Sequence, residues 1–226
     1  MPLIVQNSGL TALMPPLLFG STGYYALLAQ FENVAVDCSM RYDKRFKATH
    51  RFEIADTHGR INITVPVSRP KGVFNEGSLR WCDITVSDHN HWWSNVLSTL
   101  ESAYGRTPFF EFYIDRLLPL FAPRPLSAEP ESLTSLIAHA DTTIRKIICP
   151  QTKVEYLYGD IQNIPADNTA DVRKADFNSF TPRKEYYQVR SRKFGFLPGL
   201  SVLDLIFNMG PEAPLVLQSA PAYNHQ

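Results

Sequence analysis

The sequence predicts a mixed α/β fold, in which an N-terminal βαβ unit and a β-hairpin build a mixed sheet flanked by helices. Three observations predict it. A strand, a glycine-containing turn and a helix follow one another near the N-terminus, apolar residues alternate over residues 52–67, and apolar residues recur at helical spacing over residues 93–147. We expect a single α/β domain over residues 1–212 and a C-terminal tail over residues 213–226.

The βαβ unit is indicated by the order of apolar runs and chain breaks. Residues 10–14 form a short apolar run that two prolines end, residues 24–31 are expected to be a helix, and residues 34–36 a buried strand. The turn over residues 15–24 would then lie at the carboxyl edge of the sheet, where open α/β sheets bind ligands.

The hairpin is predicted from alternation on either side of a turn at residues 56–59. Pro66 lacks an amide donor and should end the second arm. Further strands are expected over residues 83–86 and 186–189.

Helices are expected where apolar residues recur every three or four positions. These segments are residues 93–104, 110–120, 133–147 and 200–208. Asp88 or Asn90 is available to cap the first of them, and Gly105 to end it. Residues 159–182 follow no period, and so long a loop is either disordered or a mobile lid.

Composition excludes several classes of function. The chain has 22 Lys and Arg against 22 Asp and Glu, so no bulk charge attracts nucleic acid or an anionic membrane. The uncharged first 31 residues contain prolines and glycines that disfavour a membrane-spanning helix. The three cysteines are far apart in the sequence, which favours buried, inert thiols and a reducing, cytoplasmic location.

One segment concentrates positive charge in this neutral chain. Five cations and a histidine fall within residues 41–51, and arginine can bind a phosphate or carboxylate with two hydrogen bonds. They are Arg41, Lys44, Arg45, Lys47, His50 and Arg51. The segment is either a local anion site or a solvated charged face in which Asp43 and Glu53 pair with some of the cations.

The glycine turn over residues 15–24 is a second candidate for anion binding. A turn that opens a helix exposes backbone amides, and the helix dipole favours an anion there. Gly23 and Tyr24 would stand at this position. Both nucleotide-binding fingerprints fail, because the turn has no GxGxxG and no Lys-Ser or Lys-Thr ending, so a plain connection is the alternative.

Two further clusters have a structural and a functional interpretation. His89 and His91 beside Asp88 are too few and too splayed for a metal site, so we expect surface histidines, no metal and no cofactor. The corner over residues 104–110, where Gly105 permits a positive φ, either forms a pocket or is a plain helix junction in which Arg106 binds the terminal carbonyls.

No hydrolase motif such as Gly-x-Ser-x-Gly or HExxH is present. An acid or base role would therefore fall to Asp37, His50 or Asp204, each nominated only by its position. Asp204 also stands three residues after Ser201, in a capping-box-like helix start.

Four blocks of sequence, in order along nearly the whole chain, resemble the WbqC-like family of bacterial proteins. They are Leu13-Met14-Pro15 to Gly23-Tyr24-Tyr25; Tyr42-Asp43-Lys44-Arg45 to His50-Arg51 with Thr64-Val65-Pro66-Val67; Ser102-Ala103-Tyr104 with Pro108-Phe109-Phe110-Glu111; and Tyr187-Gln188, Gly195-Phe196 and residues 200–205. Two positions differ from the family pattern. Met14 stands where many members have Gln, and Val96 stands where a histidine is expected eight residues before Tyr104.

The resemblance implies a role in bacterial surface-polysaccharide (O-antigen) assembly, with transfer of an acyl or aminoacyl group to a nucleotide-linked amino sugar as the preferred chemistry. We therefore expect a transferase-like protein that acts on a nucleotide sugar or a similar phosphorylated small molecule. The alternative is a non-catalytic binding or scaffold protein of the same pathway, which Val96 would favour if the histidine is catalytic in other members. RNA binding through residues 41–52 is a third interpretation, and the zero net charge disfavours it.

The expected site residues follow from this interpretation. Asp37 and His50 would be the acid and base. The substrate would be bound by Gly23, Tyr24, Lys44, Arg45, Arg51, Tyr104, Arg106 and Phe109. This interpretation requires the glycine turn and the basic segment to face one crevice. The sequence does not indicate an oligomeric state.

Overall fold

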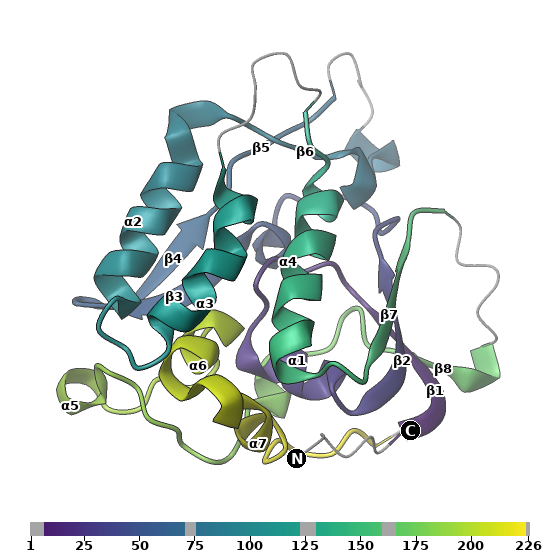
Figure 1. The fold of residues 1–226 in the computed structure, drawn as a ribbon. Coiled ribbons are helices and arrows are strands. Elements are labelled where there is room, and N and C mark those ends of the chain that lie inside the picture. Colours follow the sequence, from purple (N-terminus) through teal and green to yellow (C-terminus); the bar gives the residue numbers. More distant parts are fainter. Residues whose placement is uncertain (1–6, 71–75, 123–129, 160–165, 225–226) are drawn as a thin grey trace.

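The computed structural model describes residues 7–70, 76–122, 130–159 and 166–224 (Figure 1). It confirms the mixed α/β class. The main sheet has four parallel strands in the order β7-β2-β1-β8. These strands are β1 (Asn7–Met14), β2 (Phe31–Asp37), β7 (Lys153–Leu157) and β8 (Thr169–Asp171).

The predicted βαβ unit is present. Helix α1 (Thr22–Leu28) connects β1 to the parallel strand β2, and the side chain of Ser21 caps it by accepting from the amide of Tyr24 at 3.2 Å. All seven residues of α1 are buried. This helix is therefore packed inside the protein.

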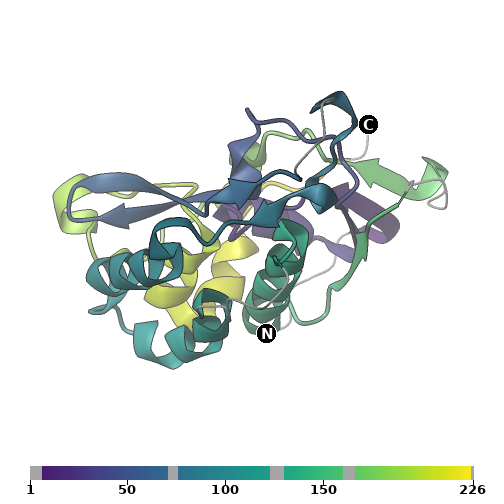
Figure 2. The same ribbon diagram turned by 90° about the horizontal axis from the view of Figure 1, so that it is seen from above.

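The predicted hairpin is also present, but it forms a sheet of its own. Strands β3 (Arg51–Asp56) and β4 (Gly59–Thr64) pair with each other, and the short strands β5 (Val67–Ser68) and β6 (Thr85–Val86) make a second antiparallel pair beyond Pro66. The free edge of β3 is covered, because the backbone carbonyl of Glu53 accepts from the amide of Ser201 and the amide of Ala55 donates to the hydroxyl of Tyr104. Figures 1 and 2 both show the hairpin and the main sheet on opposite sides of the molecule.

The α-helices are α1, α2 (Trp92–Tyr104), α3 (Phe110–Leu117), α4 (Leu133–Ile148), α5 (Ser191–Phe194), α6 (Val202–Met209) and α7 (Ala213–Leu217). Helices α2, α3, α4 and α6 follow the apolar periodicity of the sequence, whereas α5 and α7 were not expected, and α7 lies in the segment expected to be a tail. The 3₁₀ turns are η1 (Lys47–Thr49), η2 (Glu76–Ser78), η3 (Trp81–Asp83), η4 (His89–His91), η5 (Leu118–Phe121), η6 (Ala166–Asn168), η7 (Phe177–Phe180) and η8 (Gly210–Glu212).

The ends of α2 correct two expectations. Neither Asp88 nor Asn90 caps this helix, because the turn η4 comes between, and the N-cap is His91 without a side-chain hydrogen bond. Gly105 does follow the last residue of α2, but its φ is −57°, so a positive φ is not the reason for a glycine at this position. A Cβ there would come within 2.6 Å of the carbonyl oxygen of Glu101, which explains the glycine.

Two expectations about the last third of the chain are wrong. Residues 186–189 form no strand, and the alternating side chains of Tyr186 and Gln188 both hydrogen-bond to the carboxylate of Asp204. The expected structureless loop contains strand β8 of the main sheet and the turn η7, which packs on α1. Residues 160–165 of that loop lie outside the described residues.

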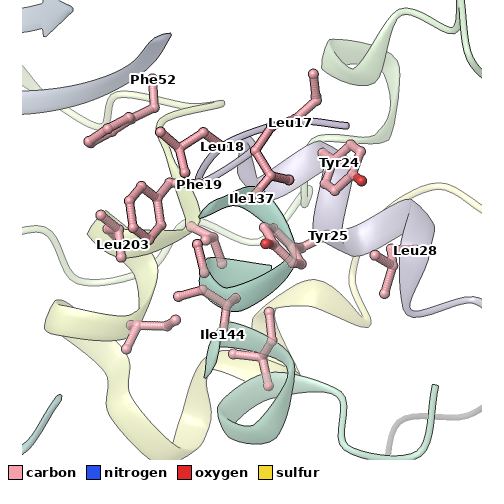
Figure 3. Packing of buried hydrophobic residues seen from close by; sticks show 14 of the residues in the cluster. Leu17, Leu18, Phe19, Tyr24, Tyr25, Leu28, Phe52, Ile137, Ile144 and Leu203 are labelled. Atoms are coloured by element: carbon pink, nitrogen blue, oxygen red, sulfur yellow. The ribbon is translucent and has the colours of Figure 1, made fainter. Parts of the chain in front are cut away.

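A core of buried apolar side chains joins the sheet, the hairpin and the helices. Phe19, after β1, packs edge-on against Phe52 of β3 with the ring centroids 5.0 Å apart, and Figure 3 shows Leu203 of α6 beside it. Ile137 and Ile144, one above the other on α4, face the same core. This packing fixes the carboxyl ends of the strands relative to the helices.

Candidate functional site

The carboxyl ends of the four parallel strands form the edge at which open α/β sheets bind ligands. Strand β2 ends there at Asp37 and β8 ends at Asp171, with β1 between them. The chain leaves β2 directly into the basic segment, residues 41–51. Charged side chains from distant parts of the sequence therefore meet at this edge.

Arg173 bridges the two strand ends. Its Nη1 lies 2.7 Å from Oδ2 of Asp37, and its Nη2 and Nε lie 2.6 and 2.9 Å from the two carboxylate oxygens of Asp171. These hydrogen bonds raise the pKa of Arg173 and lower the pKa of Asp171. Both groups are charged at neutral pH.

Asp37 is almost fully buried, with 1% of its surface exposed. Its Oδ1 accepts from the amide of Ser39 at 3.0 Å and from the hydroxyl of Ser39 at 2.7 Å, while Oδ2 accepts from Arg173. Both oxygens are therefore engaged, and these bonds hold the carboxylate in one orientation. Its geometry is that of a residue that positions Arg173.

A hollow of about 1360 Å³ opens beside this ion pair. We call it the basic hollow. It is lined by Met40, Arg41, Tyr42, Asp43, Lys44, Arg45, Phe46, Trp81, Asp171, Arg173, Lys174 and Ala175. Five of these side chains are cationic and two are anionic, so the lining is net positive. Positive charge around a concave surface concentrates anions there.

The basic hollow also has an aromatic wall. The ring of Tyr42 meets the buried ring of Trp81 edge-on, with the centroids 4.8 Å apart. Backbone hydrogen bonds from Trp81 to Met40 and from Tyr42 to Leu79 hold the two segments together. The start of the basic segment is thereby fixed against the turn η3.

The glycine turn does not reach the basic hollow. The amide of Thr22 donates to the carbonyl of Leu200 and that of Tyr24 to the side chain of Ser21, so both serve the protein's own structure. A Cβ on Gly23 would lie 2.0 Å from the carbonyl oxygen of Phe177, which shows that the glycine allows close packing against η7. The expected shared crevice is therefore not formed by this turn.

Of the residues proposed from the basic segment, Lys44 and Arg45 line the hollow and two others do not. Nε of Arg51 donates to the hydroxyl of Thr64 at 2.9 Å in the hairpin. Nδ1 of His50 lies 3.0 Å from the carbonyl oxygen of Val65, which can only accept, so this nitrogen carries the proton. Burial lowers the pKa of His50, and its ring is therefore neutral at pH 7.

The three residues proposed around the helix corner lie elsewhere. Tyr104 is buried and donates to Oδ1 of Asp204 at 2.9 Å. Arg106 is exposed at the junction of α2 and α3. Phe109 is half-buried, and its ring lies so close to Gly210 that a Cβ there would come within 2.5 Å of it.

Asp204 is the centre of a buried polar network. Besides Tyr104, its carboxylate accepts from the hydroxyl of Tyr186 at 2.6 Å and from the side-chain amide of Gln188 at 2.9 Å. Burial raises the pKa of Asp204, and the three donors offset part of that effect. The network connects the end of α2 to α6 and to residues 186–188, and the Asp204 carboxylate is used in it instead of forming a capping box.

Sequence reasoning missed Arg173, Lys174 and Trp81. Arg173 and Lys174 follow the three-residue strand β8, in a segment whose apolar residues have no period. The only clue in the sequence is that Asp171 and Arg173 are two residues apart, which would place them on the same face of an extended segment. Trp81 lies in a short 3₁₀ turn that carries no periodic pattern.

Other chemistries find little support in the described residues. No group of three or more His, Cys, Asp and Glu side chains in the described ranges is placed to hold a metal ion. The three cysteines are free, and burial raises the pKa of Cys38 to about 12, far from that of a reactive thiolate. Among the helices in the described part of the chain, none has the length and apolar character needed to cross a membrane.

Fold and site together define a mixed α/β protein with a positively charged hollow at the carboxyl edge of a parallel sheet. The chain belongs to the WbqC-like protein family, whose model matches residues 16–158, more than half of the 226 residues. The matched region includes the basic segment and Trp81 and ends before Arg173. No match was found among curated proteins or among solved structures.

Proposed function

We propose that the protein binds a phosphorylated small molecule, a nucleotide-linked sugar, in the basic hollow, and that it acts in the assembly of bacterial surface polysaccharide (O-antigen). The observation that carries the proposal is the net positive lining of a hollow at the carboxyl edge of the sheet. Membership of the WbqC-like family supports the pathway.

The lining suits a diphosphate with an attached ring. Arg41, Lys44 and Lys174 are exposed cations on the hollow, and Arg45 pairs with the exposed Asp43 at 3.5 Å. A surface pair of this kind is worth little, so a phosphate can replace it at small cost. Half-buried Tyr42 offers a ring face for the base or sugar.

The enzymatic form of this proposal is transfer of an acyl or aminoacyl group to an amino sugar. In such a step the sugar nitrogen forms an amide bond to the acyl carbon, the bond from that carbon to its carrier breaks, and a proton of the amine passes to the departing carrier. Asp37 lies behind the hollow as the expected base, but Arg173 and Ser39 occupy both of its oxygens.

The engagement of Asp37 favours a second candidate, a non-catalytic binding or scaffold protein of the same pathway. In that case the hollow presents the nucleotide sugar to a partner enzyme, and no proton transfer is required of its lining. The two candidates share the ligand and differ only in turnover.

Calorimetric titration with a nucleoside diphosphate sugar tests the binding. A Lys44→Ala, Arg45→Ala double variant should lose roughly tenfold or more in affinity, because two charge-assisted hydrogen bonds are removed. The matched control is Lys47→Ala, which removes a cation of the same segment outside the lining. Equal affinity of wild type and double variant would refute the site.

Turnover is tested separately by incubating the full chain with the nucleotide-linked amino sugar and an acyl thioester donor, followed by mass spectrometry. An amide product that Asp37→Asn abolishes supports the enzyme. Tight binding without product supports the scaffold protein.

A further inference from the structure

A second hollow, of about 370 Å³, lies between strand β4 and helix α2. Figure 1 shows α2 running beside the hairpin. We call this hollow the hairpin groove. It is lined by Ile61, Asn62, Ile63, Thr64, Pro66, His89, Asn90, Trp92, Asn95, Val96 and Thr99. None of the residues proposed from the sequence to bind substrate lines it.

The lining has an apolar floor and a polar rim. The four residues from α2 stand at positions i, i+3, i+4 and i+7, so they share one face of the helix, and of these Trp92 and Val96 are buried. On β4 the alternation buries Ile63 and exposes Asn62 and Thr64.

The chemistry of the rim differs from that of the basic hollow. The hairpin groove has three side-chain amides, two hydroxyls and one imidazole, and no Lys, Arg, Asp or Glu among its lining residues. The lining residues therefore offer a charged ligand no opposite charge, and the Nε of Arg51, which contacts Thr64 of the rim, is engaged in that hydrogen bond. An amide presents a donor and an acceptor side by side, which matches neighbouring hydroxyl groups on one ligand.

Parts of the rim are already ordered. The side-chain amide of Asn95 donates to the carbonyl of Asn90 at 3.0 Å, the hydroxyl of Thr99 donates to the carbonyl of Asn95 at 2.7 Å, and Thr64 accepts from Arg51. Side chains that are fixed before binding lose less conformational entropy when a ligand arrives. The volume is at the lower end of the range for small-ligand sites.

We propose that the hairpin groove binds an uncharged polyhydroxylated ligand, a sugar unit, through its amide and hydroxyl rim. Its role as the site for the acceptor sugar rests on the proposed function of the basic hollow. The basic segment connects the two places, because it lines the basic hollow up to Phe46 and reaches the groove at Arg51, which holds Thr64.

The chain contains its own reporters for the two sites. Trp81 lines the basic hollow, Trp92 lines the hairpin groove, and Trp93 lines neither. Trp92 is part of the groove wall, so the NMR signal of its indole N–H should respond to a ligand bound there. The three indole signals of the full chain can be followed in one nitrogen–proton correlation spectrum.

The test is a titration with methyl glucoside and N-acetylglucosamine, and separately with inorganic pyrophosphate. The sugars should shift the Trp92 signal in a saturable manner and leave Trp81 unchanged. Pyrophosphate should shift Trp81 alone. If the sugars do not shift the Trp92 signal while pyrophosphate shifts Trp81, the groove proposal fails and the basic hollow stands. If the sugars shift Trp92 and pyrophosphate does not shift Trp81, only the basic hollow is refuted.

A pair of variants locates the sugar. Asn62→Ala removes an exposed rim amide and should weaken sugar binding by roughly fivefold to tenfold, the value of one lost hydrogen bond. Ser98→Ala is the matched control, an exposed residue of α2 outside the lining. Unchanged binding in Asn62→Ala, or an equal loss in both variants, would overturn the assignment.

Discussion

Arg173 and Asp37, 136 residues apart in the chain, form an ion pair in which Nη1 and Oδ2 are 2.7 Å apart. Arg173 also binds Asp171, so one guanidinium joins the ends of β8 and β2 across the end of β1. Arg173 lines the basic hollow, and the pair ties together the carboxyl ends of the two strands that flank β1. If the proposed function holds, stability and ligand binding depend on the same side chain.

Arg173→Ala should destabilise the fold as well as weaken ligand binding. The change leaves the buried carboxylate of Asp37 without its cation, and loss of one partner of a buried pair costs roughly 3–5 kcal/mol. The arginine side chain is 30% exposed, so water reaches the pair and the loss should be about 3 kcal/mol. Urea unfolding at pH 7 measures it.

Lys174→Ala is the control for Arg173→Ala. Lys174 is an exposed cation of the same hollow, so its loss should reduce affinity for a nucleotide sugar and leave the free energy of unfolding within about 0.5 kcal/mol. Equal stability of the two variants would show that the ion pair contributes nothing to the fold.

Most of the fold could be predicted because apolar periodicity is a local signal. The strands around α1, the hairpin and the long helices all fall where the alternation or the helical spacing placed them. Strands β7 and β8 of the main sheet were both missed. The three residues of β8 are too few for a period, and this strand gains its place only by pairing with β1. The alternation at Tyr186 and Gln188 resembles that of a strand, but it arises because both side chains hydrogen-bond to the buried Asp204.

The site was harder to predict than the fold, because its parts meet through tertiary contacts. Charge density in the sequence did indicate Lys44 and Arg45, and both line the basic hollow. Nothing in the sequence marks Arg173 as a site residue, because its place in the site depends on the pairing of β8 with β1. Gly23 suggested an anion site, but glycine serves equally where two backbones approach closely, and the sequence does not distinguish these uses.

Gly23→Ala tests that explanation of the turn. The added Cβ would lie 2.0 Å from the carbonyl oxygen of Phe177, so α1 or η7 must move, and the free energy of unfolding should fall by about 3 kcal/mol. Gly159→Ala is the matched control, because a Cβ there meets nothing within 4 Å. Thermal denaturation of both variants measures the difference, and a stable Gly23→Ala protein would show that the turn has free space for a ligand.

His50 should titrate below its ordinary value in the folded protein. Burial is the main cause of its lowered pKa, and the nearby charges of Arg51 and Lys47 add to it. Since the unfolded chain takes up the proton first as pH falls through about 6.5, stability should decrease over the window just below that pH and then level off. NMR titration of the imidazole gives the pKa directly.

Substitution of the neighbouring charges separates the causes at His50. Arg51→Gln should raise the midpoint of the His50 titration only slightly, because burial remains. A wild-type midpoint at or above 6.5 would contradict the neutral ring and restore His50 as a candidate acid.

Asp204 should make the fold less stable as pH rises from acid toward neutral. Its folded pKa is raised, mainly by burial, so between the ordinary value near 3.8 and the folded pKa the native state holds a proton that the unfolded chain has lost. The free energy of unfolding therefore decreases through this window and is level above it. Asp204→Asn should remove that slope in urea unfolding measured across the acid range.

Two further variants test the direction of the pH dependence assigned to Asp204. Tyr186→Phe removes a donor to the charged form and should extend the upper end of the window to higher pH, because that hydrogen bond lowers the folded pKa. Asp171, whose pKa is lowered by Arg173, contributes the opposite slope below 3.8, and Asp171→Asn should remove only that part. If Asp204→Asn and wild type keep parallel profiles between the two pKa values, the buried carboxylate titrates normally and water must reach it.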